Sequence, residues 1–188
     1  QVIDEAGNSI ALNIKFDVIS GESLYNDRMD AVIKELENKK LLEESEGAMI
    51  VNLEKYNLSP CLIKKSDGAT LYATRDITAA IERHKNYKFD RLFYEVGQEQ
   101  KLHFKQIFKV LELMGYSWAK DCVHIEHGLY LGEDGKKFAT RHGKTVFMEE
   151  VLNETIELAK KEIQKREKVT GKELDKRAKA IALAAILY

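Results

Sequence analysis

The chain has 188 residues, of which 32% are charged and 44% are hydrophobic, and its formal net charge at pH 7 is −1. This length suffices for one sizeable core, or for one domain with an appendage. A net charge so close to zero argues against a protein that coats nucleic acid without sequence preference, although it leaves room for a local basic site.

The cysteines and the apolar segments bear on location. Only Cys61 and Cys122 are present, which excludes a disulfide framework and favours a reducing, cytoplasmic location. No apolar run approaches the ~20 residues that a membrane-spanning helix needs, so we expect no membrane partner. The last segment, 180–188, is strongly apolar, and we expect parts of a longer polypeptide, beyond both ends of this chain, to complete its packing.

The first part of the chain predicts a mixture of strands and helices. A strand-like run, an amphipathic helix and a turn leading into a strand are predicted, in this order, at residues 9–20, 26–42 and 43–53. The single proline, Pro60, separates them from residues 61–74. In that stretch two strand-like runs flank Ser66-Asp67-Gly68, which is typical of a hairpin turn.

The second part alternates helices and strands. We expect a helix, a strand, a second helix and a second strand, at residues 75–87, 91–96, 97–116 and 122–127. Strands with little polar alternation, separated by a helix, predict an α/β fold with a parallel sheet covered on both faces. A charged amphipathic helix follows at about 148–168, and a break at 169–171 precedes the final helix.

Ligands of open parallel sheets bind outside the carboxyl ends of the strands. That rule indicates Gly97–His103 and His127–Leu129, which follow the two strands, together with the loop at 135–144. Two glycines, Gly135 and Gly143, and five potential cations gather in this loop, the cations being Lys136, Lys137, Arg141, His142 and Lys144. Such charge runs are usually solvated loops, but a hinged basic loop at this edge could also close over a polyphosphate.

Two other stretches carry candidate binding residues. Tyr72 and Asp76 lie four apart where a helix begins, and a phenol with a carboxylate could grip a cationic substrate. The plainer alternative is that Asp76 caps or charges the first helical turn and Tyr72 is core. Gly97 permits close approach of a ligand, and Gln100 and His103 share a helix face, near a helix N-terminus that favours anions. An ordinary turn with solvated side chains is the alternative here.

The histidines of the stretch HIEHGL, 124–129, do not indicate a metal site. His124 and His127 are three residues apart on a predicted strand, so their side chains point to opposite faces. We therefore expect no metal site. Gly128 is the more informative residue, because a flat nucleotide base could lie against its backbone.

Taken together, these stretches resemble class I arginyl-tRNA synthetases of the bacterial type. The resemblance rests on four motifs that span most of the chain: KFDVISGESLYND (15–27), CLIKKSDGATLYATRD (61–76), VGQEQKLHFKQIFKVLELMGY (96–116) and DGKKFATRHGKTV (134–146). The last motif is similar to the family's variant of the KMSKS signature. Phe138 and Ala139 replace its usual Met-Ser pair, His142 stands where a lysine is common, and no HIGH-like sequence occurs in the chain.

The resemblance implies a fold and a division of the chain. The fold would be the second half of a Rossmann-like, parallel-sheet nucleotide fold with a C-terminal helical segment. Residues 1–60 would be a connecting or inserted region, 61–147 the second half of the catalytic domain, and 148–188 a helical segment leading to an anticodon-binding domain. The half that carries the HIGH motif would precede Gln1.

The resemblance also implies roles. Tyr72, Asp76 and Gln100 would bind arginine, which suits a guanidinium fork that seeks a carboxylate and an amide oxygen. Lys137 and Arg141 would be catalytic, stabilising the triphosphate as the arginine carboxylate attacks the α-phosphate. The ATP site would be lined by residues from the sheet edge and the basic loop, namely Gly97, His103, Gly128, Leu129 and Lys137.

The implied reaction joins arginine to ATP, giving arginyl-adenylate and then arginyl-tRNA, with Mg²⁺ accompanying ATP and tRNA(Arg) as the partner. Alone, this chain would be inactive. Two alternatives remain open from the residues themselves. One is another adenylyl-transferring nucleotide-binding domain with a different substrate, and the other is a helical interaction module, without catalysis, in which 148–188 does the binding.

Overall fold

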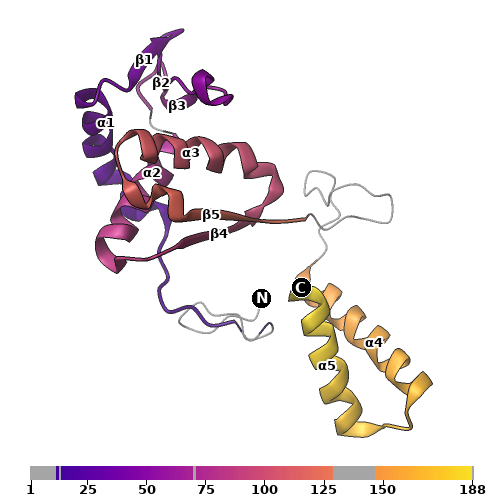
Figure 1. Ribbon diagram of the computed structural model, residues 1–188. Coiled ribbons are helices and arrows are strands. Elements are labelled where there is room, and N and C mark those ends of the chain that lie inside the picture. Colours follow the sequence, from indigo (N-terminus) through magenta and orange to yellow (C-terminus); the bar gives the residue numbers. More distant parts are fainter. Residues whose placement is uncertain (1–11, 13, 70, 129–146, 188) are drawn as a thin grey trace. The chain divides into compact units, whose positions relative to one another are not determined.

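The structure is a computed structural model that describes residues 12, 14–69, 71–128 and 147–187 (Figure 1). The chain divides into two compact units, one comprising Ser20–Leu129 and the other Gln1–Ile19 with Tyr130–Tyr188. In the described residues of the first unit, the elements follow in the order η1 (Glu22–Arg28), α1 (Met29–Asn38), β1 (Leu42–Ser45), β2 (Ala48–Val51), η2 (Glu54–Tyr56), β3 (Cys61–Lys64), α2 (Tyr72–Tyr87), β4 (Leu92–Gly97), η3 (Gln98–Gln100), α3 (Lys101–Leu113), η4 (Ser117–Asp121) and β5 (Cys122–His127).

The strands β1, β2 and β3 form an antiparallel sheet in that order. A two-residue turn joins β1 to β2, since Ser45 pairs with Ala48. Both turn residues, Glu46 and Gly47, have positive φ angles, of 50° and 77°. Turns of this kind match the twist of a hairpin. The predicted turn and strand at 43–53 are thus a complete strand–turn–strand hairpin.

The hairpin predicted around Ser66-Asp67-Gly68 is wrong. These residues do form a turn, in which the Asp67 carboxylate accepts the Ala69 N–H at 2.9 Å, but the turn leads from β3 into helix α2. The physical reason lies in the residues that follow. Ala73, Thr74, Ile77 and Ala80 are buried along one face of α2, and this spacing is helical.

The strand predicted at 9–20 is also wrong for the residues that can be checked: Ile14 forms an isolated bridge, and none of residues 12 and 14–20 belongs to a strand.

The strands β4 and β5 pair in parallel, from Leu92 opposite Cys122 to Gly97 opposite His127. This confirms the predicted strand–helix–strand unit. Helix α3 covers one face, where the Phe104 ring lies 4.7 Å from that of Tyr94. On the other face the described structure leaves apolar side chains open to solvent: Phe93 (53% exposed), Val123 (39%) and Ile125 (41%). The sheet was predicted to be covered on both faces, but in the described part of the chain only the face under α3 is covered.

One hydrophobic core joins the two sheets of this unit. Its fully buried side chains include Leu36 of α1, Val51 of β2, Ile63 of β3, Ile77 of α2, and Ile107 and Leu111 of α3. Buried threonines fix α2 further: Thr74 donates its hydroxyl to the Ile63 carbonyl of β3 at 2.5 Å. The core and this hydrogen bond hold the starts of α2 and α3, which carry three of the predicted site residues, Tyr72, Asp76 and His103.

The described helices of the second unit form a hairpin, α4 (Met148–Arg166) and α5 (Gly171–Leu187), drawn in orange and yellow in Figure 1. Small and apolar side chains are buried between them, namely Leu152, Ala159, Leu174, Ala178 and Ala182. The two predicted helices are confirmed, with α4 ending at Arg166. Within the described residues, no helix is long and apolar enough to cross a membrane.

Candidate active site

Tyr72 and Asp76 lie at the start of α2, as predicted. Neither has the purely structural role of the alternative, in which Tyr72 is a core residue and Asp76 caps or charges the first helical turn. Tyr72 is the first residue of the helix, and with 68% of its surface exposed it is not a core residue. Asp76 does not cap the helix, because the N-cap is Leu71 and Asp76 lies one turn further on. Both side chains are therefore available for a role at the surface of the unit.

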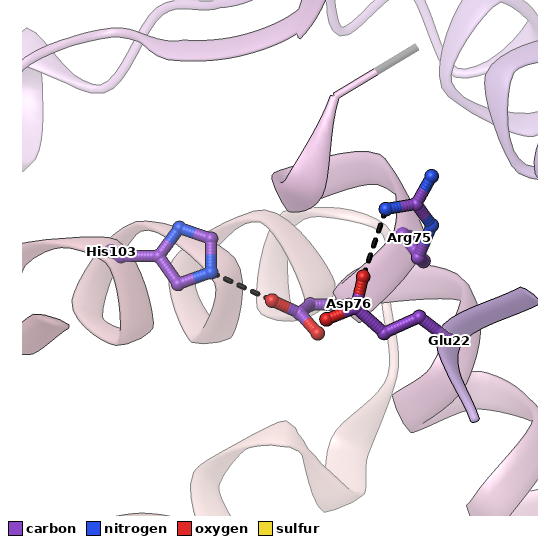
Figure 2. Close-up of polar contacts among 4 residues, drawn as sticks. All are labelled: Glu22, Arg75, Asp76 and His103. Carbon is purple, nitrogen blue, oxygen red and sulfur yellow. Dashed lines mark hydrogen bonds and ion pairs between the residues drawn. The ribbon is translucent and has the colours of Figure 1, made fainter. Parts of the chain in front are cut away.

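The Asp76 carboxylate is held by a residue from another helix. Its Oδ2 atom lies 2.8 Å from Nε2 of His103, on the first turn of α3 (Figure 2). The two side chains are 34% and 25% exposed, so solvent or a ligand still reaches them. The structure thus brings together two residues 27 positions apart in the sequence, one predicted for arginine and the other for ATP.

A second acidic residue pairs with Arg75, the residue before Asp76, and the sequence reasoning did not single it out. The Glu22 carboxylate, from η1, accepts a hydrogen bond from the guanidinium of Arg75 at 3.0 Å (Figure 2). The same guanidinium lies 5.7 Å from the centre of the Tyr72 ring. Nε of Arg75 is buried without a hydrogen-bond partner in the described structure. Glu22 lies inside the GESLYND stretch, and that motif was the available signal.

The other predicted residues mark the carboxyl ends of the parallel strands. Gly97 ends β4 opposite His127 of β5, so Gly97 and Gly128 follow the same edge of the sheet. A Cβ atom on Gly128 would meet no described atom within 4 Å. Gln100 is exposed and directly precedes α3 as its N-cap residue, three positions before His103.

Tyr94 lies on β4, on the face of the parallel sheet that α3 covers. Its hydroxyl is buried without a hydrogen-bond partner in the described structure. Burial raises the pKa of Tyr94 to about 12, although the positive charge of Arg83 lowers it. A phenol with so high a pKa stays protonated near neutral pH. Tyr94 is therefore no candidate for a general base.

The predicted loop residues Leu129, Lys137 and Arg141 lie outside the described residues, as do Phe138, Ala139 and His142. Their roles stay predictions.

The two histidines of β5 have separate environments. His124 donates its Nε2–H to the Val96 carbonyl at 2.8 Å, and its ring lies 4.6 Å from that of Phe104. Nδ1 of His127 is 3.0 Å from the Gly128 carbonyl oxygen. Within the described residues, no group of three or more His, Cys, Asp or Glu side chains is arranged to hold a metal ion.

Comparison with known families decides where the chain belongs. A family model described as "tRNA synthetases class I (R), catalytic domain" matches residues 3–188. The chain belongs to this family. Arginine–tRNA ligase of Halothermothrix orenii is 51% identical over 178 residues, covering 94% of this chain and 31% of the relative. Arginine–tRNA ligase of Clostridium perfringens is 49% identical with the same coverage. The chain thus spans 31% of the length of these curated relatives.

Solved structures of class I (R) synthetases show the same fold. Arginyl-tRNA synthetase of Plasmodium falciparum superposes with a TM-score of 0.70 at 24% identity, covering 94% of this chain and 29% of that one. The Thermus thermophilus arginyl-tRNA synthetase gives a TM-score of 0.69 at 18% identity, with 94% and 36% covered. The predicted α/β fold, and its assignment to this catalytic-domain family, are confirmed.

Proposed function

We propose that this chain supplies the arginine pocket and the pyrophosphate-binding loop of an arginine–tRNA ligase. The complete enzyme would join arginine to ATP as arginyl-adenylate and transfer the arginyl group to tRNA(Arg). The observation that carries the proposal is the Asp76 carboxylate, partly exposed and hydrogen-bonded to His103 at 2.8 Å. It occurs in a chain 51% identical to an arginine–tRNA ligase.

The residues around Asp76 have the chemistry to bind a guanidinium group. A guanidinium is a rigid planar fork of N–H donors that pairs with carboxylates and lies over aromatic rings. Arg75 already places such a group near the Tyr72 ring, 5.7 Å from its centre, and against the Glu22 carboxylate at 3.0 Å. In our proposal, substrate arginine makes the equivalent contacts with Asp76 and Tyr72, and Gln100 holds its other end.

The ATP half of the site follows the carboxyl edge of the parallel sheet. Gly97, Gly128 and Leu129 would line the nucleotide, and Lys137 with Arg141 would neutralise the pyrophosphate as it leaves. We propose that ATP is used as its magnesium complex, the usual form of a nucleoside triphosphate substrate. Chemistry of this kind depends on positioning and electrostatic stabilisation and needs no protein nucleophile.

The remaining two thirds of the relatives' length would complete the enzyme. The solvent-exposed apolar side chains on β4 and β5, Phe93, Val123 and Ile125, suit a surface that the rest of the catalytic domain covers. We also propose that the chain divides at 1–60, 61–147 and 148–188 and that the enzyme is cytoplasmic. Two buried free cysteines, Cys61 and Cys122, are compatible with a reducing compartment.

Amino-acid-dependent ATP–pyrophosphate exchange tests the proposal. The complete protein should exchange with arginine and tRNA present, and should discriminate at least about 100-fold against citrulline, which has arginine's shape without its charge. The isolated chain should give no exchange. Exchange driven by another amino acid would favour the alternative adenylyl-transferring domain, and no nucleotide turnover by the complete protein would favour the helical interaction module. Exchange by the isolated chain would contradict the proposed boundaries.

A further inference from the structure

His103 was predicted to line the ATP site, yet its hydrogen bond in the structure goes to the arginine side. Nε2 of its imidazole lies 2.8 Å from Oδ2 of Asp76 (Figure 2). An ionised carboxylate can only accept hydrogen bonds, so the imidazole donates its Nε2–H. Hydrogen bonds to a charged acceptor are shorter and stronger than neutral ones. The pair is therefore a strong constraint on the Asp76 side chain.

Both ends of this hydrogen bond are anchored in the core. On α2, Thr74, two residues before Asp76, and Ile77, directly after it, are fully buried. His103 directly precedes Phe104, which is 4% exposed and packs its ring on the parallel sheet. Because neither helix can shift without disturbing the core, the hydrogen bond restricts the Asp76 side chain to one orientation.

The carboxylate keeps enough acceptor capacity for a substrate. Its two oxygens offer about four lone-pair sites, and His103 occupies one of them. The Oδ1 atom and the second site on Oδ2 remain for the two parallel N–H groups of a guanidinium. The neighbouring cation, Arg75, is paired with Glu22 at 3.0 Å, so Asp76 does not have to satisfy it.

We propose that His103 is a positioning residue of the arginine pocket, which donates Nε2–H to Asp76 and holds that carboxylate ready for the substrate guanidinium. The inference rests on the proposed function, since it requires that Asp76 binds arginine. In this proposal the main role of His103 is to support the binding of arginine, rather than to contact ATP. His103 need not touch arginine to act in this way.

Three substitutions in the complete enzyme separate these roles. Gln places an amide N–H near the position of Nε2, Asn reaches only the position of Nδ1, and Leu has no donor. We expect His103→Asn and His103→Leu to raise the KM for arginine about tenfold, the loss expected for one hydrogen bond to a charge. His103→Gln should restore most of the affinity, and the KM for ATP should stay within about twofold in all three.

A double-mutant cycle with Asp76→Asn supplies a second readout. If His103 acts through Asp76, the double variant Asp76→Asn/His103→Asn should bind arginine about as poorly as Asp76→Asn alone. Residues that act independently would instead give losses that multiply. The wild-type tautomer provides a readout without substitution, because ¹⁵N NMR of labelled histidine should show His103 protonated on Nε2.

Results that contradict the positioning role of His103 differ from results that contradict the arginine pocket. An equal rise in the KM for ATP, independent losses in the cycle, or an Nε2 without a proton would overturn the positioning role. An unchanged arginine KM in His103→Asn, with a clear loss in Asp76→Asn, would overturn it while leaving the arginine pocket intact. If Asp76→Asn itself leaves arginine binding unchanged, the proposed pocket fails and this inference fails with it. Should His103→Asn not fold, the behaviour of His103→Gln and the tautomer still decide the question.

Discussion

Replacing Thr74 by valine should loosen the start of α2, which carries Tyr72 and Asp76. Thr74 is fully buried, and its Oγ1 donates to the Ile63 carbonyl at 2.5 Å. Valine keeps the shape but removes the donor, so the variant loses one hydrogen bond and leaves a buried carbonyl without it. Together we expect about 2 kcal/mol less free energy of unfolding for the unit Ser20–Leu129.

The matched control is Thr74→Ser, which keeps the hydroxyl and removes one methyl group. Loss of a single buried methyl costs about 1 kcal/mol, so serine should be milder than valine. Urea unfolding is followed through Trp118, the single tryptophan of the chain. It lies in the same unit, with its ring stacked 4.8 Å from that of His84. Both variants should lower the midpoint and leave the slope with urea unchanged.

The order of the two variants decides the argument. If Thr74→Ser destabilises the unit more than Thr74→Val, methyl packing holds α2 against β3 and the hydrogen bond is unimportant. The same variants in the complete enzyme should rank in the same order for the KM of arginine, because Tyr72 and Asp76 flank the substituted position.

In the complete enzyme, Lys137→Ala should lower kcat about 10²–10³-fold with little change in the KM for arginine, since its charge acts while pyrophosphate leaves; an unchanged kcat would make the loop an ordinary solvated one. Asp76→Asn should lower kcat/KM for arginine at least about tenfold and leave the KM for ATP unchanged; a joint rise in both KM values would contradict its role. Burial raises the pKa of the Cys61 thiol to about 12, so the unfolded chain loses this proton above about pH 8.5 while the folded chain keeps it. The stability of the folded chain therefore falls as pH rises from about 8.5 towards 12, and this loss is absent at lower pH. Site-resolved alkylation at pH 8 should label Cys61 only on unfolding; labelling of the folded chain would show that the thiol is accessible.

The fold was predictable wherever the pattern of apolar residues within one segment was enough to specify a helix or a strand. The parallel pair β4–β5 with α3 between them follows from two apolar strands and a helix with a clear buried face. The hairpin assignment failed because Ser66-Asp67-Gly68 specifies a turn but not the element after it. The run that follows is short and fits either state locally. Only packing against β3, with Ala73, Thr74 and Ile77 buried together, makes it a helix.

The contacts of the candidate site residues could not be predicted from the sequence. Chemistry and spacing indicated Asp76 and His103 separately, because each lies near the start of a helix. Their hydrogen bond joins residues 27 positions apart, and the Glu22–Arg75 pair joins residues 53 apart. Such contacts depend on how helices pack over a shared core, and the periodicity of one segment carries no information about that.

The arrangement of charge around Asp76 gives a physical reason for selecting a cationic side chain. Glu22 is matched by Arg75 at 3.0 Å, whereas the hydrogen-bond partner of Asp76 in the described structure is an imidazole rather than a guanidinium or an ammonium group. A neutral imidazole orients the carboxylate without cancelling its charge. With such an imidazole, the proposed pocket would retain one uncompensated negative charge, and a bound guanidinium would supply the matching positive charge. Citrulline fits the same shape but leaves that charge partly desolvated and unpaired, which is costly. Discrimination against citrulline should therefore weaken strongly in Asp76→Asn, where no such charge remains, and much less in His103→Asn, where the charge persists without its positioning partner.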